Sequence, residues 1–283
     1  MIGERERVLA THAVVADPFA CMVRLPREWP VSAAETIRVS RARRRLSVVR
    51  RESGVLFCRH PGGVLMPLDF GVRPDLVARA AGGFIRAYRP VTGDVVVNAG
   101  AGAETAVFAD FVGPGGHVIA IEAHPVAYSE LEALCRVNRL RQVSCFQLAL
   151  ADAPGELHLT DNPDAATNTV VGERGSLPVA ADTLDRLLGR LGVSRVDFLK
   201  MNIEGSELRA LEGFREGLAR TRHVVVSCHD FLADADPAAS AFRTKAAVRA
   251  LLKSAGFDVS EGPSDLDPWD RDYLYGRNAH ADV

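Results

Sequence analysis

From residue 94 onward the sequence alternates short apolar runs with segments of helical periodicity, and this alternation restricts the folds that the chain can adopt. Near-continuous apolar runs are typical of strands buried on both faces, as in a parallel sheet covered by helices. The sequence therefore predicts an α/β protein with a Rossmann-like, mostly parallel sheet and helices on both of its faces. The expected elements, in chain order, are Asp94–Asn98, Glu104–Val112, His117–Ile121, Val126–Asn138, Val143–Leu150, Glu156–Thr160, Ala181–Leu191, Val196–Met201, Ser206–Leu218, His223–Cys228, Phe242–Ala255, Phe257–Val259 and Tyr273–Tyr275.

The N-terminal part of the chain follows a different pattern. Short β-rich pieces separated by Gly and Pro, and then one helical stretch, precede Pro90. These expected elements are Ser47–Arg51, Val55–Cys58, Val64–Leu68 and Asp75–Tyr88. We therefore expect residues 1–89 to form a small β-rich extension that contacts a substrate or another subunit. Residues 90–283 would form the main domain, with the polar stretch 161–178 as a loop over its site.

Overall composition indicates neither a nucleic-acid nor a membrane partner. The 283 residues carry a formal net charge of −2. No uninterrupted apolar stretch approaches the roughly 20 residues that span a bilayer. The N-terminal sequence MIGERERVLA carries charges of both signs and lacks the apolar core of a signal peptide. These features predict a cytoplasmic protein.

The cysteines and the basic residues also carry little functional signal. The five cysteines, at positions 21, 58, 135, 145 and 228, form no C-x-x-C pair, which argues against a zinc ribbon or a disulfide framework. The basic run RVSRARRRLSVVRR has no interleaved aromatic residues. It favours a solvated hairpin edge or a subunit contact over nucleic-acid binding, so a homo-oligomer stays open.

A glycine loop follows the first strand of the main domain. Gly100 and Gly102 allow the backbone to turn tightly and to approach a ligand closely. Glu122 follows the next strand, where a carboxylate can accept hydrogen bonds from two ribose hydroxyls. In an open α/β sheet these two strand ends lie at the ligand-binding edge, so the pattern predicts a nucleotide-containing cofactor.

Two residues after the glycines help to distinguish between cofactors. A dinucleotide fingerprint has a third small residue, where this chain has Glu104 and Thr105. A carboxylate at a helix N-terminus repels a pyrophosphate, whereas S-adenosylmethionine has no phosphate and carries positive charge. The sequence therefore favours S-adenosylmethionine over NAD.

A second polar segment interrupts a later apolar strand. The stretch VDFLKMNIEGSE places Lys200, Asn202 and Glu204 at alternate positions before Gly205. The strand period of two predicts that these three side chains share one side. A polar row at the end of a buried strand needs partners, and a ligand or metal ion is a natural candidate.

At this segment the sequence resembles the FkbM family of methyltransferases. DFLKMNIEGSELRALEG is similar to the family pattern D-F-[IL]-K-[ILM]-D-[VI]-E-G-[AS]-E followed by L-x-G. NAGAGAETAVFADFVGPGGHVIAIEAHP, QLALADAPGELHL and VAADTLDRLL resemble three further motifs of the family in the same order. The resemblance covers about residues 92–232 and leaves the first ninety residues and the tail unexplained.

The resemblance implies a class I methyltransferase fold and an O-methyltransferase that acts on hydroxyl groups of sugars, polyketides and related natural products. The loop residues would lie against the methionine part of S-adenosylmethionine, Glu122 would hold the ribose, and residues after the second and third strands would border the adenine. The implied cofactor-binding residues are Asn98, Gly100, Ala101, Gly102, Thr105, Glu122, Ala123, Leu150, Ala151 and Asp152.

Two positions depart from the family pattern. Asn98 and Asn202 stand where the family commonly has acidic residues. Asn98 can still orient an ammonium group or a water through its side-chain oxygen. The loss of two carboxylates argues against a tightly held divalent metal, so we expect no metal site. It also leaves open an inactive member or one with an altered substrate.

Methyl transfer to a hydroxyl needs alignment and removal of a proton. His229 follows the strand HVVVSC at a carboxyl end and is the candidate general base, with Asp230 beside it as an orienting residue. The full set of candidate catalytic residues is His229, Asp230, Lys200, Asn202 and Glu204. A salt bridge from Lys200 to Glu204 or to Glu207 is the structural alternative for Lys200.

Two other functions stay open beside a small-molecule O-methyltransferase. An NAD-dependent oxidoreductase can use a similar fold. A non-catalytic nucleotide-binding module is the other, because Asn98 and Asn202 replace acids. The sequence does not identify the hydroxylated acceptor.

Overall fold

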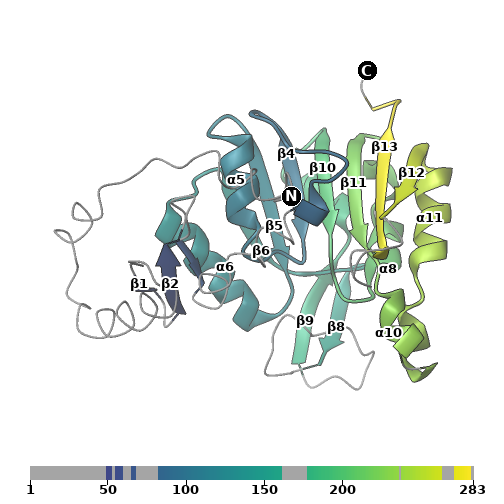
Figure 1. Ribbon diagram of the computed structural model, residues 1–283, viewed down its shortest axis with the longest axis horizontal. Coiled ribbons are helices and arrows are strands. Elements are labelled where there is room, and N and C mark those ends of the chain that lie inside the picture. The colour runs from purple at the N-terminus through teal and green to yellow at the C-terminus, as the bar shows by residue number, and fades with distance from the viewer. Residues whose placement is uncertain are drawn as a thin grey trace, which may run out of the picture.

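The computed structural model describes residues 49–52, 55–59, 65–67, 82–160, 177–235, 237–262 and 271–281. Within them a seven-stranded sheet runs in the order β12-β13-β11-β10-β4-β5-β6 and can be followed across Figure 1. In chain order these strands are β4 (Val95–Ala99), β5 (His117–Glu122), β6 (Val143–Gln147), β10 (Val196–Met201), β11 (Thr221–Ser227), β12 (Phe257–Glu261) and β13 (Tyr273–Asn278).

The pairing of these strands agrees with the alternation in the sequence. The strands β6, β5, β4, β10 and β11 are parallel to one another. Only β13 runs antiparallel, between β11 and β12. Helices connect successive apolar strands of this sheet, and such connections allow the strands to run parallel to one another. The expected Rossmann-like, mostly parallel sheet is confirmed.

Helices cover both faces of the sheet. Successive strand residues point to opposite faces, and Val96 and Val97 of β4 accordingly belong to two different hydrophobic clusters. The first cluster joins one face to α5 (Thr105–Val112) and α6 (Pro125–Asn138). The second joins the other face to α7 (Leu184–Arg190), α8 (Glu207–Glu212), α9 (Arg215–Leu218) and α11 (Lys245–Ser254). None of the helices in the described ranges is long and apolar enough to cross a membrane.

The region after the third strand differs from the prediction. The expected strand Val143–Leu150 divides into β6 and β7 (Ala149–Leu150), and β7 enters a separate sheet of order β7-β9-β8. β8 (Gly155–Leu159) and β9 (Leu177–Asp182) pair antiparallel and lie below the main sheet in Figure 1. The start of β9 was predicted as loop and its end as helix. The helix begins only after Thr183, whose hydroxyl accepts a hydrogen bond from Arg186 N.

Two helix predictions also need correction. The expected helix Ser206–Leu218 divides into α8 and α9 at Gly213, where a Cβ atom would lie 2.0 Å from Ala151 O. No helix was expected between Cys228 and Phe242, but this stretch contains α10 (Asp230–Ala235), followed by the 3₁₀ helix η3 (Pro237–Phe242). Both segments are short, so periodicity alone identified them poorly.

The three short strands predicted near the N-terminus are confirmed. They are β1 (Val49–Glu52), β2 (Val55–Arg59) and β3 (Leu65–Pro67), which form an antiparallel sheet. Asn138 of α6 attaches this sheet to the main domain, because its side chain accepts from Leu65 N at 2.8 Å and donates to Leu65 O at 2.7 Å. Of the expected helix Asp75–Tyr88, residues 82–84 are helical within the described range. Most of the basic run RVSRARRRLSVVRR and residues 161–176 of the expected loop 161–178 lie outside the described residues.

Candidate functional site

The candidate site lies at the carboxyl ends of β4 and β10, from which the chain continues to opposite sides of the sheet. These two strands are neighbours in the middle of the sheet, and the next strands along the chain, β5 and β11, lie on opposite sides of them. Ligands of open α/β sheets bind at the carboxyl ends of the strands at such a switch point. The glycine loop, Glu122, the turn 202–206 and His229 all follow the carboxyl ends of these four strands.

The glycine loop turns sharply against the neighbouring strands. Gly100 has a φ of 68°, and the backbone N–H groups of Gly100 and Ala101 both donate to Ile121 O at 3.0 Å. A Cβ atom on Gly100 would lie 1.8 Å from Asn202 O. Glycine is therefore required at position 100 by both its conformation and the close approach of the turn after β10.

Lys200 lies beneath this loop rather than in an open site. Its side chain is 1% exposed, and Nζ donates to Ala99 O at 3.3 Å and to Gly100 O at 2.6 Å. Nζ also pairs with Glu104 Oε1 at 3.0 Å, and it lies 4.7 Å from the centre of the Phe84 ring. These three acceptors use all three ammonium hydrogens. Lys200 therefore holds the loop, and its ion pair is with Glu104 instead of the expected Glu204 or Glu207.

The Glu104 carboxylate points inward from the start of α5. Its Oε1 accepts hydrogen bonds from Gly102 N at 3.0 Å and from Asn98 Nδ2 at 3.1 Å. Burial by itself raises the pKa of Glu104, but the charge of Lys200 and these hydrogen bonds outweigh it and hold the pKa below its ordinary value. Because Lys200 balances this charge, the expected repulsion of a pyrophosphate is weaker than the sequence suggested.

Asn98 is fully buried at the end of β4 and is only partly satisfied. Its Nδ2 donates to Thr105 Oγ1 at 2.9 Å as well as to Glu104, whereas its Oδ1 has no hydrogen-bond partner among the described residues. A buried acceptor without a donor is costly unless a ligand or water supplies one. Thr105 is itself fully buried, so its place is beside Asn98 rather than on an open surface.

Glu122 ends β5 with one oxygen already bonded. Its Oε1 accepts from His124 N at 2.8 Å. Burial raises the pKa of Glu122 to about 7, although the backbone N–H groups of His124 and Ala123 oppose this shift. Hydroxyl groups of a ligand that donate to Glu122 would stabilise its charged form. The ribose hydroxyls expected at this position are donors of this kind.

Of the residues expected to border an adenine, Ala123 follows β5, and the segment from Leu150 to Asp152 begins at the end of β7. Leu150 and Ala151 are buried, and Ala151 N donates to Asp182 O at 3.0 Å. Asp152 forms an exposed ion pair with Arg209 of α8, and this hydrogen bond lowers the pKa of Asp152. The break between β6 and β7 brings this segment against the end of α8.

The turn after β10 does not continue the alternation of the strand. Asn202 N donates to Ala99 O at 3.1 Å, and Glu204 adopts a left-handed conformation with a φ of 50°. Gly205 follows with a φ of 93°, and a Cβ atom on it would lie 2.7 Å from the ring of Phe242. The predicted polar row is therefore wrong beyond Met201, because this turn directs Glu204 away from Lys200.

The turn brings Glu204 to His229, and the two form a cluster with Glu207. His229 Nε2 lies 3.2 Å from Glu204 Oε2, and His229 Nδ1 lies 3.0 Å from Glu207 Oε1. Burial by itself lowers the pKa of His229, but the hydrogen bonds and charges of both carboxylates outweigh it and raise the pKa to about 10. His229 is therefore an imidazolium at neutral pH, with both N–H groups donating. This geometry argues against the expected role of His229 as the general base.

Asp230 does not form a dyad with His229. Its Oδ1 accepts from Thr244 N at 3.0 Å and Lys245 N at 2.9 Å, at the start of α11. Adjacent residues at the end of β11 thus point in different directions. Asp230 stabilises the N-terminus of α11, as a carboxylate does near the positive end of a helix dipole.

Glu207 is a site residue that sequence reasoning underestimated. It was considered only as an alternative partner of Lys200, yet it is fully buried and its Oε1 also accepts from Ile203 N and Gly205 N. Its spacing of three residues from Glu204 across a glycine was the available signal. Within the described ranges, no group of three or more His, Cys, Asp or Glu side chains is arranged to hold a metal ion.

Comparison with known proteins identifies relatives of the main domain. Residues 94–259 match the family model described as the methyltransferase FkbM domain. The chain is also 36% identical over 78 residues to the AMB antimetabolite synthetase AmbE of Pseudomonas aeruginosa. That match covers 27% of this chain and spans only 3% of the length of the curated relative.

Solved structures share a more distant likeness. The fibrillarin of Aeropyrum pernix, with natively bound S-adenosyl-L-methionine, is 16% identical with a TM-score of 0.42, and the alignment covers 81% of this chain and 98% of that one. A putative O-methyltransferase from Klebsiella pneumoniae is 10% identical with a TM-score of 0.42, covering 98% of this chain and 100% of that one.

Proposed function

The chain belongs to the FkbM methyltransferase family, and we propose that it transfers a methyl group from S-adenosylmethionine to a hydroxyl group of a small molecule. The observation that carries the proposal is the pair formed by Glu204 and His229 beside the glycine loop, at the carboxyl ends of β10 and β11. When bound, S-adenosylmethionine supplies an electrophilic methyl group on a positively charged sulfur.

The residues around the glycine loop fit this cofactor. The buried Asn98 Oδ1 lacks a donor, and the ammonium of the methionine part would provide one. The glycine loop from Gly100 to Gly102 would lie against the same part of the cofactor. Glu122 would accept the ribose hydroxyls, for which a carboxylate offers two oxygens.

The remaining cofactor contacts follow from the strand ends. Ala123 and the segment from Leu150 to Asp152 would border the adenine. Thr105 would act through Asn98, because its hydroxyl accepts from Asn98 Nδ2 at 2.9 Å. Lys200 would act through the loop backbone, since its ammonium is engaged by Ala99, Gly100 and Glu104.

The charge of the cluster supports a cationic cofactor. Two carboxylates and one imidazolium leave Glu204, Glu207 and His229 with one net negative charge in a buried setting. Such a charge attracts a sulfonium more strongly in a low-dielectric site than it would in water. A site built for a pyrophosphate would need the opposite sign.

Glu204 is the residue we propose as proton acceptor. Its side chain is 25% exposed, whereas those of His229 and Glu207 are 5% and 0% exposed, so Glu204 is the member of the cluster that a substrate can reach. An alcohol has a pKa far above 7 and loses its proton as the bond to the methyl group forms. The His229 imidazolium would orient Glu204, and Asn202 would line the approach to it.

The acceptor is proposed as a hydroxylated natural-product intermediate. The similarity to an antimetabolite synthetase supports this class. The described cysteines Cys135, Cys145 and Cys228 are free thiols, which supports a reducing, cytoplasmic setting. Pairing between copies of the chain through residues 1–89 stays a proposal.

Calorimetry and mass spectrometry test the proposed function together. We expect S-adenosylmethionine to bind and NAD to give no heat. A panel of hydroxylated metabolites should yield a product heavier by one CH₂ unit, because a methyl group replaces the hydroxyl hydrogen. The exposed residue Asp258 provides a control, since Asp258→Ala should leave binding and product formation unchanged. Binding of NAD in place of S-adenosylmethionine would overturn the proposal. Cofactor binding without methylation, with Glu204→Gln indistinguishable from the native protein, would favour a non-catalytic module.

A further inference from the structure

Asp272 holds the backbone on both sides of His229. It immediately precedes β13 and is 2% exposed. Its backbone oxygen accepts from Cys228 N at 3.1 Å, and its side-chain Oδ2 accepts from Phe231 N at 2.9 Å. His229 lies between these two anchored residues, so one aspartate fixes the segment in which β11 becomes α10.

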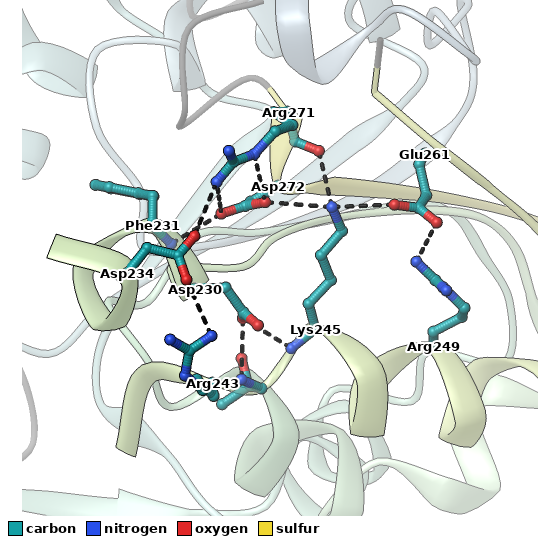
Figure 2. Close-up of polar contacts among 10 residues, drawn as sticks. Asp230, Phe231, Asp234, Arg243, Lys245, Arg249, Glu261, Arg271 and Asp272 are labelled. Carbon is teal, nitrogen blue, oxygen red and sulfur yellow. Dashed lines mark hydrogen bonds and ion pairs between the residues drawn. The ribbon is translucent and has the colours of Figure 1, made fainter. Parts of the chain in front are cut away.

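The Asp272 carboxylate is in turn held by charged side chains. Lys245 Nζ lies 3.2 Å from Asp272 Oδ1 and 3.0 Å from Glu261 Oε2, and it also donates to Arg271 O at 3.0 Å. Figure 2 shows Lys245 between the carboxylates of Asp272 and Glu261, with Arg271 on the other side of Asp272. Arg271 Nε lies 3.3 Å from Asp272 Oδ1. A carboxylate that is hydrogen-bonded to cationic partners is a strong acceptor, here for Phe231 N–H.

Asp230 also anchors the segment 228–231, through hydrogen bonds from the start of α11. Because Asp230 accepts from Thr244 N and Lys245 N, its side chain is committed to α11. The direction of Asp230 and the two bonds to Asp272 together determine the backbone path from Cys228 to Phe231. On that path the His229 ring reaches both Glu204 and Glu207.

We propose that Asp272 is a positioning residue that aligns the His229 ring with Glu204 through the backbone of residues 228–231. The inference rests on the proposed function of the Glu204–His229 pair. Asp272 bonds the backbone that flanks His229, so its effect on the reaction passes through the orientation of the imidazolium. A misplacement of about 1 Å in such a site can cost on the order of a hundredfold in rate.

The outer part of the same network provides a matched control. Glu261 pairs with Lys245 and with Arg249, but its contacts lie on α11 and outside the segment 228–231. Glu261→Gln therefore removes a charge from the network and leaves the bonds of Asp272 to Cys228 and Phe231 in place. If the network only stabilised the fold, folded Asp272→Ala and Glu261→Gln would have similar effects on turnover.

The experiment compares Asp272→Ala, Asp272→Asn and Glu261→Gln in the full chain. We expect Asp272→Ala to lower kcat by about tenfold or more, with the KM for S-adenosylmethionine changed less than twofold, because the cofactor residues lie on other strands. Asp272→Asn keeps an acceptor oxygen for Phe231 N–H and should retain more of the native kcat. Glu261→Gln should keep kcat within twofold.

A second readout is independent of activity. The ring N–H signals of His229 in ¹⁵N-histidine-labelled protein, assigned with His229→Gln, should be observed in the native protein and in Glu261→Gln. They should shift or disappear in folded Asp272→Ala. Native His229 signals together with a kcat equal to that of Glu261→Gln would overturn the inference. If Asp272→Ala does not fold, the same two results with Asp272→Leu decide it, because Leu keeps the size of the side chain and lacks an acceptor for Phe231 N–H. A native protein without methyltransferase activity would count against the proposed function, and the histidine signals would still test the alignment.

Discussion

Glu204 Oε2 lies 3.2 Å from His229 Nε2, and Glu204 reaches this position only through a left-handed backbone conformation with a φ of 50°. Non-glycine residues rarely adopt this conformation, and they do so at a small energetic cost. The cost is offset here by an ion pair to a histidine that is itself clamped by Glu207. Backbone strain and an ion pair thus coincide at the more exposed of the two carboxylates in this cluster.

Replacement of Glu204 should affect turnover rather than cofactor binding. Glu204→Gln removes the proposed proton acceptor and keeps the size of the side chain, so we expect kcat to fall by about 10²–10⁴-fold. The affinity for S-adenosylmethionine should change little, because the proposed ribose and methionine contacts come from β4 and β5. Single-turnover rates and calorimetry measure the two quantities separately. A native rate in Glu204→Gln would remove Glu204 from the chemistry.

His229 should make protein stability depend on alkaline pH. Its pKa is raised from 6.5 to about 10 in the folded protein by Glu204 and Glu207. A raised folded pKa stabilises the fold fully below the unfolded value of 6.5, and this contribution is lost as pH rises toward 10. Thermal unfolding should therefore show a steeper loss of stability over this window for the native protein than for His229→Gln. Parallel curves for the two proteins would contradict the ion cluster.

Glu122 should make cofactor binding depend on pH near neutrality. Burial raises the pKa of Glu122 to about 7, and ribose hydroxyls donate best to the charged form. The affinity for S-adenosylmethionine should therefore weaken as pH falls through 7, and Glu122→Gln should flatten this dependence. Glu122→Ala should weaken binding by about 1–3 kcal/mol. Calorimetric titrations across this pH range give both results, and unchanged affinity in Glu122→Ala would exclude Glu122 from the site.

The Lys200–Glu104 pair should be strongly coupled. Removal of one partner leaves the other charge buried, so Lys200→Met and Glu104→Gln should each destabilise the fold by about 3–5 kcal/mol. The double variant should lose less than the sum of the two. Urea unfolding measures all three. Arg215→Met breaks an exposed ion pair with Glu212 and should change stability by less than about 1 kcal/mol. Additive losses in the double variant would show that the two charges act independently.

Much of the architecture could be predicted from the sequence because it depends on local patterns. The apolar runs of β4, β5, β10 and β11 and the glycine loop identified both the parallel sheet and the edge where its site lies. β9 was missed because its partner β8 is distant in the chain and the intervening residues are polar. Strand pairing of this kind depends on tertiary context rather than on periodicity.

The candidate site was predicted as a set of residues but not as an arrangement. Lys200, Glu204 and His229 were all named as candidates, yet the partners that the structure gives them were not predicted. The period of two applies only while the strand continues, and the positive φ of Glu204 and Gly205 ends it after Met201. Asp272 carried no sequence signal, because it lies far along the chain and acts through backbone N–H and C=O groups.

The ammonium beneath the glycine loop has a consequence for protein engineering. Lys200 belongs to β10 but bonds the carbonyl groups of Ala99 and Gly100 and the carboxylate of Glu104, which belong to the segment around the end of β4. A loop transplanted from another methyltransferase would meet a buried lysine whose acceptors had been exchanged. The loop and β10 therefore form a single module, and a chimaera should exchange both or neither.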